Sequence, residues 1–186
     1  MCIRDRYGEQ IPTNAKLLAS DFSASMLRNL VKKKDGKVAD GDELWKRLQT
    51  AEIDAHKLTG ISDESVSHSL SGFLYMLLGD PRKALGQTRR VLKNDGVMAL
   101  SCWKGSQWID MMNIINSVDA VKKWPGLPPA WTTIEGVKGE LEAVGFSDVG
   151  AEEVDVAMRF DTYEEVMDLC GHKSKHPRLF IVFARS

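Results

Sequence analysis

The sequence predicts an α/β fold in which helices cover a mostly parallel β-sheet. Short apolar runs at residues 15–20, 48–53 and 97–103 have the length and composition of buried strands. Amphipathic segments at residues 24–33 and 81–92 lie between these runs and carry apolar side chains at helical spacing. A chain that alternates strands and helices in this way is typical of parallel strands joined by helical crossovers.

Capping and turn residues set the boundaries of these elements. Ser23 can cap the first helix, and the turn residues 34–36 are expected to end it. A short helix is expected at residues 42–48, and a rather polar strand at residues 65–71. The sequence Lys-Asn-Asp-Gly at residues 93–96 predicts a tight turn before the strongest strand of the chain.

The C-terminal part continues the alternation of helices and strands. In order, the expected elements are a helix at residues 107–123, a rigid loop at 124–129, a helix at 132–144 ended by Gly145, a strand at 148–159, a helix at 162–170 and a strand at 179–184. A helical connection between the last two strands allows an antiparallel strand at the edge of the sheet.

Composition excludes several classes of partner. The 25 Lys and Arg residues nearly balance 26 Asp and Glu residues, so bulk charge gives no case for nucleic acid or an anionic membrane. No apolar stretch approaches the roughly 18 residues of a membrane span. Cys2, Cys102 and Cys170 are widely spaced and form no CxxC pair, which favours a reducing, cytoplasmic setting.

The first candidate site residue is Asp21, which ends the strand at residues 15–20. Ligands of open parallel sheets bind at the carboxyl ends of the strands. A carboxylate there can accept hydrogen bonds from both hydroxyl groups of a ribose. The alternative interpretation is that Asp21 only caps the following helix.

The second candidate is the pair Asp54-Ala55, which follows the next strand. A carboxylate at this point can accept a hydrogen bond from the exocyclic amine of an adenine, and a neighbouring backbone amide can meet a ring nitrogen. An aspartate in a loop is also a common turn residue, so this pair is weak when taken alone.

Three motifs in a fixed order resemble one family. They are Asp21-Phe22-Ser23-Ala24-Ser25-Met26-Leu27, then Asp54-Ala55, then Arg90-Val91-Leu92-Lys93-Asn94-Asp95-Gly96 before a core strand. This order is similar to that of the class I S-adenosylmethionine-dependent methyltransferases, especially the small-molecule type of ubiquinone biosynthesis and fungal secondary metabolism. The resemblance covers about residues 13–104, and it implies a Rossmann-like, doubly wound sheet with an antiparallel last strand.

The resemblance also implies a cofactor and its contacts. Asp21 would hold the ribose of S-adenosylmethionine, Phe22 and Met26 would flank the adenosine, Asp54 and Ala55 would contact the adenine, and Ser71 would face the reacting end. The expected activity is methyl transfer to a small organic acceptor by the intact parent protein, with this truncated chain impaired. The expected layout is one domain over residues 1–186 with a substrate-side insertion at 105–131. Neither a metal site nor a catalytic residue is assigned.

The glycine-rich loop of the family does not precede Asp21. Gly8 is the sole glycine before that residue, and residues 1–6 resemble adapter read-through rather than protein sequence. We therefore expect an N-terminally truncated domain that lacks the first central strand and the glycine-rich loop. A non-catalytic, methyltransferase-like binding module is the main alternative, and a nicotinamide-dependent dehydrogenase is a weaker one.

Other candidates have simpler structural explanations. His172 and His176 have helical metal-ligand spacing, but Gly171 and Pro177 favour a surface loop. His56 and His68 could act as bases, yet neither is assigned a role. Cys102 is expected in the core. The tryptophans near the insertion could pack in the core or line a substrate pocket; they are Trp103, Trp108, Trp124 and Trp131.

Overall fold

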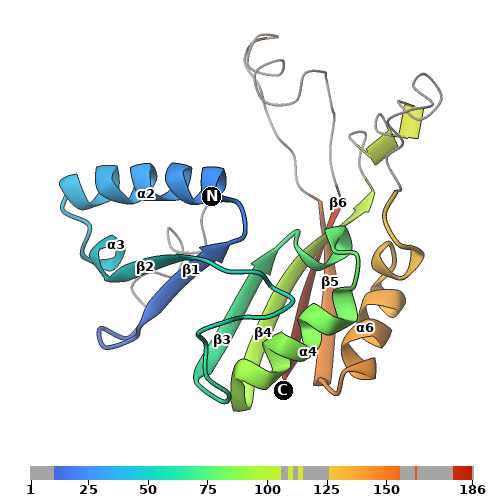
Figure 1. Ribbon diagram of the computed structural model, residues 1–186. Coiled ribbons are helices and arrows are strands. Elements are labelled where there is room, and N and C mark those ends of the chain that lie inside the picture. Colours follow the sequence, from blue (N-terminus) through green and yellow to red (C-terminus); the bar gives the residue numbers. More distant parts are fainter. Residues whose placement is uncertain are drawn as a thin grey trace. The chain divides into compact units, whose positions relative to one another are not determined.

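The computed structural model describes residues 11–105, 109–110, 113–114, 126–155, 162 and 178–185. The chain divides into two compact units, Met1–Thr59 and Gly60–Ser186. Each unit carries parallel strands and helices (Figure 1), which confirms the expected α/β class. The expectation of one domain over residues 1–186 stays a prediction.

The first unit is built on a pair of parallel strands. Strand β1 (Leu17–Asp21) pairs in register with β2 (Leu48–Glu52), so Asp21 lies opposite Glu52. The connection between the strands holds helix α2 (Ala24–Ala39) and the short helix α3 (Glu43–Arg47). This crossover gives both strands the same direction, and their carboxyl ends therefore lie at one edge.

Helix α2 is longer than the sequence predicts. The expected end at residues 34–36 is wrong, because the helix continues through Gly36 to Ala39 and the chain turns at Gly41, where φ is +85°. Contacts to later elements hold this last part: Lys34 Nζ donates to the carbonyl of Leu48 at 2.6 Å, and Lys33 Nζ lies 5.8 Å from the ring centroid of Trp45. Contacts of this kind override the modest helix penalty of one glycine.

The second unit contains a four-stranded sheet in the order β3-β4-β6-β5. The members are β3 (Val66–Gly72), β4 (Leu92–Gly105), β5 (Ser147–Asp155) and β6 (Arg178–Arg185). Strands β3 and β4 are parallel, and β6 is antiparallel to both of its neighbours. The antiparallel last strand is confirmed: β6 pairs on one side with β4 and on the other with β5, which lies at the edge of the sheet.

The expected turn at residues 93–96 occurs as an irregularity within β4. Val66 pairs with Leu92, and His68 then pairs with Val97, so the intervening residues of β4 leave the ladder. Asp95 has φ of +67°, a conformation that aspartate tolerates better than most residues. The turn therefore joins helix α4 (Pro81–Val91) to the strand without a separate loop.

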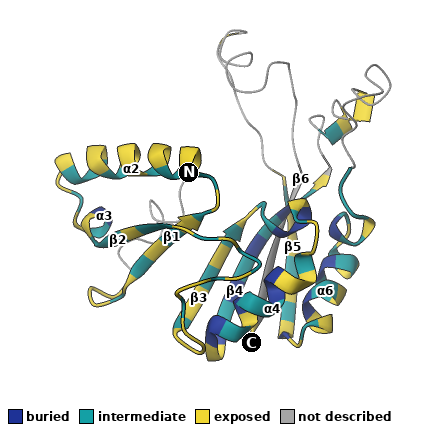
Figure 2. Ribbon diagram, viewed as in Figure 1, coloured by how far each residue is buried: buried dark blue, intermediate teal, exposed yellow. Residues whose placement is uncertain are grey.

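Helices α4 and α6 (Ile134–Ala143) lie side by side over one face of the sheet of the second unit (Figure 1). Their inward side chains and those of β4 form a buried core, shown in dark blue in Figure 2. Its fully buried members include Ala84, Leu85, Met98, Cys102, Val137 and Leu141. Burial of such apolar side chains is the main stabilising term of a domain.

The second unit also contains two short 3-10 helices, η2 (Tyr75–Leu77) and η3 (Pro129–Trp131). The chain comes close to itself where η3 meets α6, since a Cβ at Gly136 would clash with the carbonyl oxygen of Ala130. Thr133 caps α6 and Gly145, with φ of +90°, follows its end, as the sequence predicts. Most of the helix expected at 107–123 and all but one residue of that at 162–170 lie outside the described residues.

Candidate functional site

The tip of β1 is shaped by Asp21 and Ser23. Ser23 is the N-cap of α2, because its side chain accepts from the amide of Met26 at 3.4 Å. Asp21 Oδ1 accepts from the amide of Ser23 at 2.8 Å. Among the described residues, Asp21 Oδ2 has no hydrogen bond or ion pair. The N-cap position belongs to Ser23, so the carboxylate of Asp21 keeps an oxygen with which to accept hydrogen bonds from a ligand.

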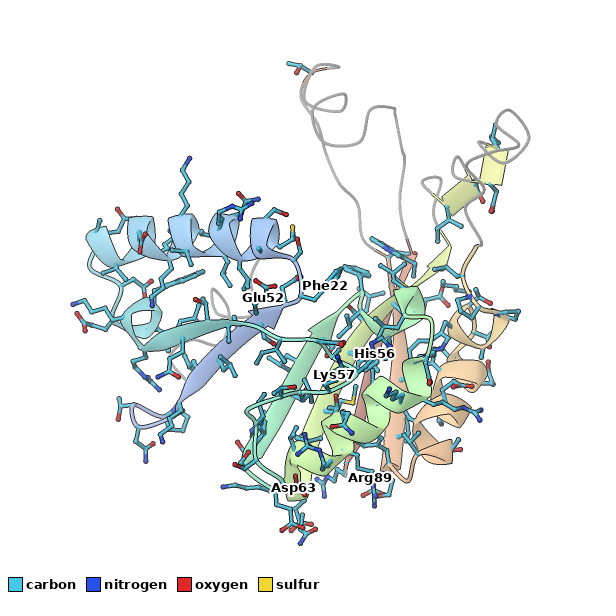
Figure 3. The ribbon with its side chains drawn as sticks, viewed as in Figure 1. Phe22, Glu52, His56, Lys57, Asp63 and Arg89 are labelled. Carbon is cyan, nitrogen blue, oxygen red and sulfur yellow. The ribbon has the colours of Figure 1, made fainter. Side chains whose placement is uncertain are left out.

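Two large apolar side chains follow Asp21 closely in the chain, Phe22 in the turn and Met26 in the first turn of α2. Phe22 is 73% exposed and Met26 is 57% exposed. Phe22 lies near the end of β1 together with Glu52 of β2 (Figure 3). Apolar side chains beside a carboxylate with an open acceptor suit a ligand that combines an apolar ring with hydroxyl groups.

Asp54 lies two residues beyond the end of β2, which is the strand that pairs with β1 and its last residue, Asp21. The amide of Ile53 donates to the carbonyl of Asp21 at 3.1 Å, which extends the ladder to the residue before Asp54. The tips of β1 and β2 therefore place Asp21 and Asp54 at one edge of the same two-stranded sheet. Ala55 follows in the turn and is half-buried.

The carboxylate of Asp54 is held by its own turn. Its Oδ1 accepts from the amide of His56 at 2.9 Å and lies 3.1 Å from His56 Nδ1, and its Oδ2 is 3.8 Å from Lys57 Nζ. The backbone hydrogen bond from His56 lowers the pKa of Asp54 most, followed by the hydrogen bond to the His56 ring. Asp54 therefore acts as an acceptor at neutral pH and has the turn geometry of the alternative interpretation as well.

Three further polar side chains lie opposite Asp21 or in contact with Asp54. Glu52 is exposed and directly opposite Asp21, while His56 and Lys57 contact Asp54. Glu52 is part of no sequence motif, because the strand register that pairs it with Asp21 is not visible in the sequence. Figure 3 labels all three.

Ser71 lies in β3 of the second unit. The hydroxyl of Tyr75, in the loop that follows β3, lies 2.7 Å from Thr88 Oγ1. Burial raises the pKa of Tyr75, and the hydrogen bonds to Thr88 and Ser71 oppose that shift. The expected contact between Ser71 and the reacting end of a cofactor stays a prediction.

The remaining candidates divide between the core and the undescribed residues. Trp131 is 1% exposed and Cys102 is buried, where desolvation raises the pKa of its thiol to about 12. Trp103 is half-buried at the end of β4. Trp108, Trp124, His172 and His176 lie outside the described residues.

The sequence matches a known protein family and resembles a known member of it. Residues 5–100, more than half of the chain, match the family described as "Methyltransferase domain". The chain belongs to this family. Methyltransferase ucsB from Acremonium sp is 33% identical over 165 residues, which are 88% of this chain and 57% of that protein. The chain thus spans little more than half the length of this methyltransferase relative.

Solved structures support the methyltransferase fold. A methyltransferase from Bacillus halodurans matches with a TM-score of 0.59 and 14% identity over 92% of this chain and 83% of that one. A SAM-dependent methyltransferase from Aquifex aeolicus matches with a TM-score of 0.57 and 19% identity over 97% and 74% of the two chains. The resemblance to class I S-adenosylmethionine-dependent methyltransferases, with their Rossmann-like sheet, is confirmed. Among the described residues, no helix is long and apolar enough to cross a membrane.

Proposed function

We propose that this methyltransferase domain binds the adenosine part of S-adenosylmethionine at the tips of β1 and β2, through Asp21, Phe22, Met26, Asp54 and Ala55. The observation that carries the proposal is the open Oδ2 of Asp21 at the carboxyl end of a parallel strand, beside exposed Phe22. A carboxylate that accepts from two vicinal hydroxyl groups forms charge-assisted hydrogen bonds, which are stronger than neutral ones.

The donor and acceptor groups of the first unit fit a nucleoside. Asp21 supplies acceptors for ribose hydroxyl groups, and Phe22 and Met26 supply apolar surface for a planar base. Asp54 supplies an ionised acceptor for the adenine amine, since its lowered pKa keeps it charged at neutral pH. Its bonds to His56 fix the orientation of that carboxylate before any ligand arrives.

We further propose methyl transfer to an oxygen, nitrogen or carbon of a small organic acceptor. S-adenosylmethionine, when bound, supplies an activated methyl group, and the protein supplies alignment and exclusion of water. A side-chain base is not required for this chemistry, which agrees with the lack of an assigned catalytic residue. Ser71 and the segment 106–131 are the proposed neighbours of the reacting groups, and a cytoplasmic setting is proposed from the spacing of the cysteines.

Calorimetric titration of the chain with S-adenosylmethionine tests the binding proposal. Asp21→Ala should weaken binding by about tenfold or more, because charge-assisted hydrogen bonds contribute about 1.5–3 kcal/mol. Asp35→Asn is the matched control, since Asp35 is an exposed carboxylate on α2 of the same unit. Absence of binding by the unmodified chain, or equal affinity of the Asp21→Ala variant, would end the proposal.

A further inference from the structure

The loop after β3 contributes two aromatic residues that have different surroundings. Tyr75 stacks on Trp131 with ring centroids 6.0 Å apart, and these side chains are only 3% and 1% exposed. Phe73 stacks on Trp103 with centroids 4.2 Å apart and an interplanar angle of 15°. Both members of this second pair are half-buried, so the first pair belongs to the core and the second retains accessible ring surface.

The Phe73–Trp103 pair is held in place by the backbone of two parallel strands. Phe73 directly follows β3, and its amide donates to the carbonyl of Ser101 at 3.0 Å. The amide of Trp103 donates to the Met76 sulfur at 3.3 Å. Both rings therefore lie at the carboxyl end of the β3–β4 pair, the end at which open parallel sheets bind their ligands.

Phe73 also has an uncommon backbone conformation. Its φ is +53°, in the left-handed region that residues with bulky side chains seldom adopt. Leu77 of η2 is 64% exposed and belongs to neither stacked pair. This uncommon conformation directs a half-buried ring onto Trp103 rather than into the core.

We infer that the stacked pair of Phe73 and Trp103 is a specificity-determining platform that selects a planar, aromatic methyl acceptor. This inference rests on the proposed function, since it names the class of acceptor for that reaction. A flat ring can extend the stack over an accessible ring face, whereas a saturated, puckered ring of the same size cannot make the same contact. Selection then comes from ring geometry.

The test uses two probes that share a carbon skeleton and a hydroxyl group, 1-naphthol and decahydro-1-naphthol. The 186-residue chain is labelled with 5-fluorotryptophan, and its five tryptophan resonances are assigned by single Trp→Phe substitutions. We expect 1-naphthol to shift the Trp103 fluorine resonance saturably, while the buried Trp131 and Trp45 resonances stay in place. Decahydro-1-naphthol should bind at least about fivefold more weakly, in line with the strength of aromatic pairs.

Variants separate stacking from folding. Calorimetry should show 1-naphthol binding weakened about two- to tenfold by Phe73→Leu and retained by Phe73→Tyr, which keeps the ring. Leu77→Ser is the control in the same loop and should bind 1-naphthol as the unmodified chain does. An unmoved Trp103 resonance, equal binding of both probes, or equal loss in Phe73→Leu and Phe73→Tyr would overturn the inference.

A parallel titration with S-adenosylmethionine on the same samples keeps the two proposals apart. Failure of 1-naphthol with intact cofactor binding overturns the aromatic platform alone. Failure of cofactor binding with intact 1-naphthol binding contradicts the proposed function and leaves a surface that recognises aromatic rings. The Phe73→Leu variant should keep the cofactor affinity of the unmodified chain.

Discussion

The two units of the chain differ in how far their apolar side chains are buried. In the first unit, Trp45 is the one buried apolar residue among those described, and α2 buries none of its side chains. Leu18, Phe22, Met26 and Val31 of that unit are all exposed. In the second unit, residues from β4, α4 and α6 form a continuous buried core, and Leu85 is fully inaccessible to solvent.

This difference separates the stabilising core from the proposed nucleoside site. The second unit has the packed core that stabilises a fold, whereas the first unit carries the carboxylates and exposed apolar groups that suit a nucleoside. A ligand that covers Phe22 and Met26 would remove from water apolar surface that the protein itself leaves exposed. Substitutions in the two units should therefore affect different measurements.

The largest expected contrast is between two leucines that differ in burial. Leu85→Ala, at a site with 0% exposure, should lower the free energy of unfolding by about 2–5 kcal/mol because it leaves a cavity. Leu18→Ala, at a site with 48% exposure, should change it by less than about 1 kcal/mol. Urea denaturation followed by fluorescence measures both, and equal losses would contradict the contrast.

The buried hydrogen bond of the second unit should give the next largest effect. Tyr75→Phe removes the 2.7 Å contact to Thr88 and should cost about 1–3 kcal/mol at pH 7. Burial raises the pKa of Tyr75 above its ordinary value of 10. The neutral Tyr75 side chain therefore makes its full contribution to the free energy of unfolding below pH 10. That contribution is lost as the pH rises through the raised pKa of the folded protein. The gap in unfolding free energy between the unmodified chain and Tyr75→Phe should then narrow above pH 10.

A partner variant checks that the effect of Tyr75→Phe comes from the unsatisfied hydroxyl. Replacing both groups, Tyr75→Phe with Thr88→Val, should cost less than the sum of the single substitutions, because no buried hydroxyl is left without its partner. Additive losses would show that the two side chains act independently and that the contact contributes little.

The smallest expected effect on stability comes from the titration of Asp54, in the turn after β2 of the first unit. Hydrogen bonds from the amide and ring of His56 lower the pKa of Asp54 below its ordinary value of 3.8. The stabilising contribution is therefore present above pH 3.8 and is lost as the pH falls through the lower value in the folded protein. Carbon-detected titration of the Asp54 carboxyl measures the midpoint, which His56→Ala should raise; a midpoint above 3.8 in the unmodified chain would refute this.

The comparison of the units also shows what the sequence can predict. The strand tips were predictable because an apolar run followed by Asp21 or by Asp54 is a local pattern. The full length of α2 was not, since Lys34 bonds to Leu48, a residue 14 positions away. The position of β6 between β4 and β5 likewise depends on pairing between distant segments.

The residues of the candidate site likewise divide into those predicted by local motifs and those placed by contacts between distant segments. Sequence motifs predicted Asp21, Phe22, Met26, Asp54 and Ala55, and these residues lie at or shortly after the carboxyl ends of β1 and β2 in the chain. Glu52 was missed because only strand register places it opposite Asp21. Phe73 was missed because neither its φ of +53° nor its stacking on Trp103 is encoded by a local motif.

Amide chemical-shift mapping with S-adenosylhomocysteine tests most directly whether the tips of β1 and β2 bind one nucleoside. We expect the amides of residues 21–26 and 54–57 to shift together and to yield the same dissociation constant. Shifts in only one of these segments, different dissociation constants for the two, or shifts confined to residues beyond Gly60 would contradict it.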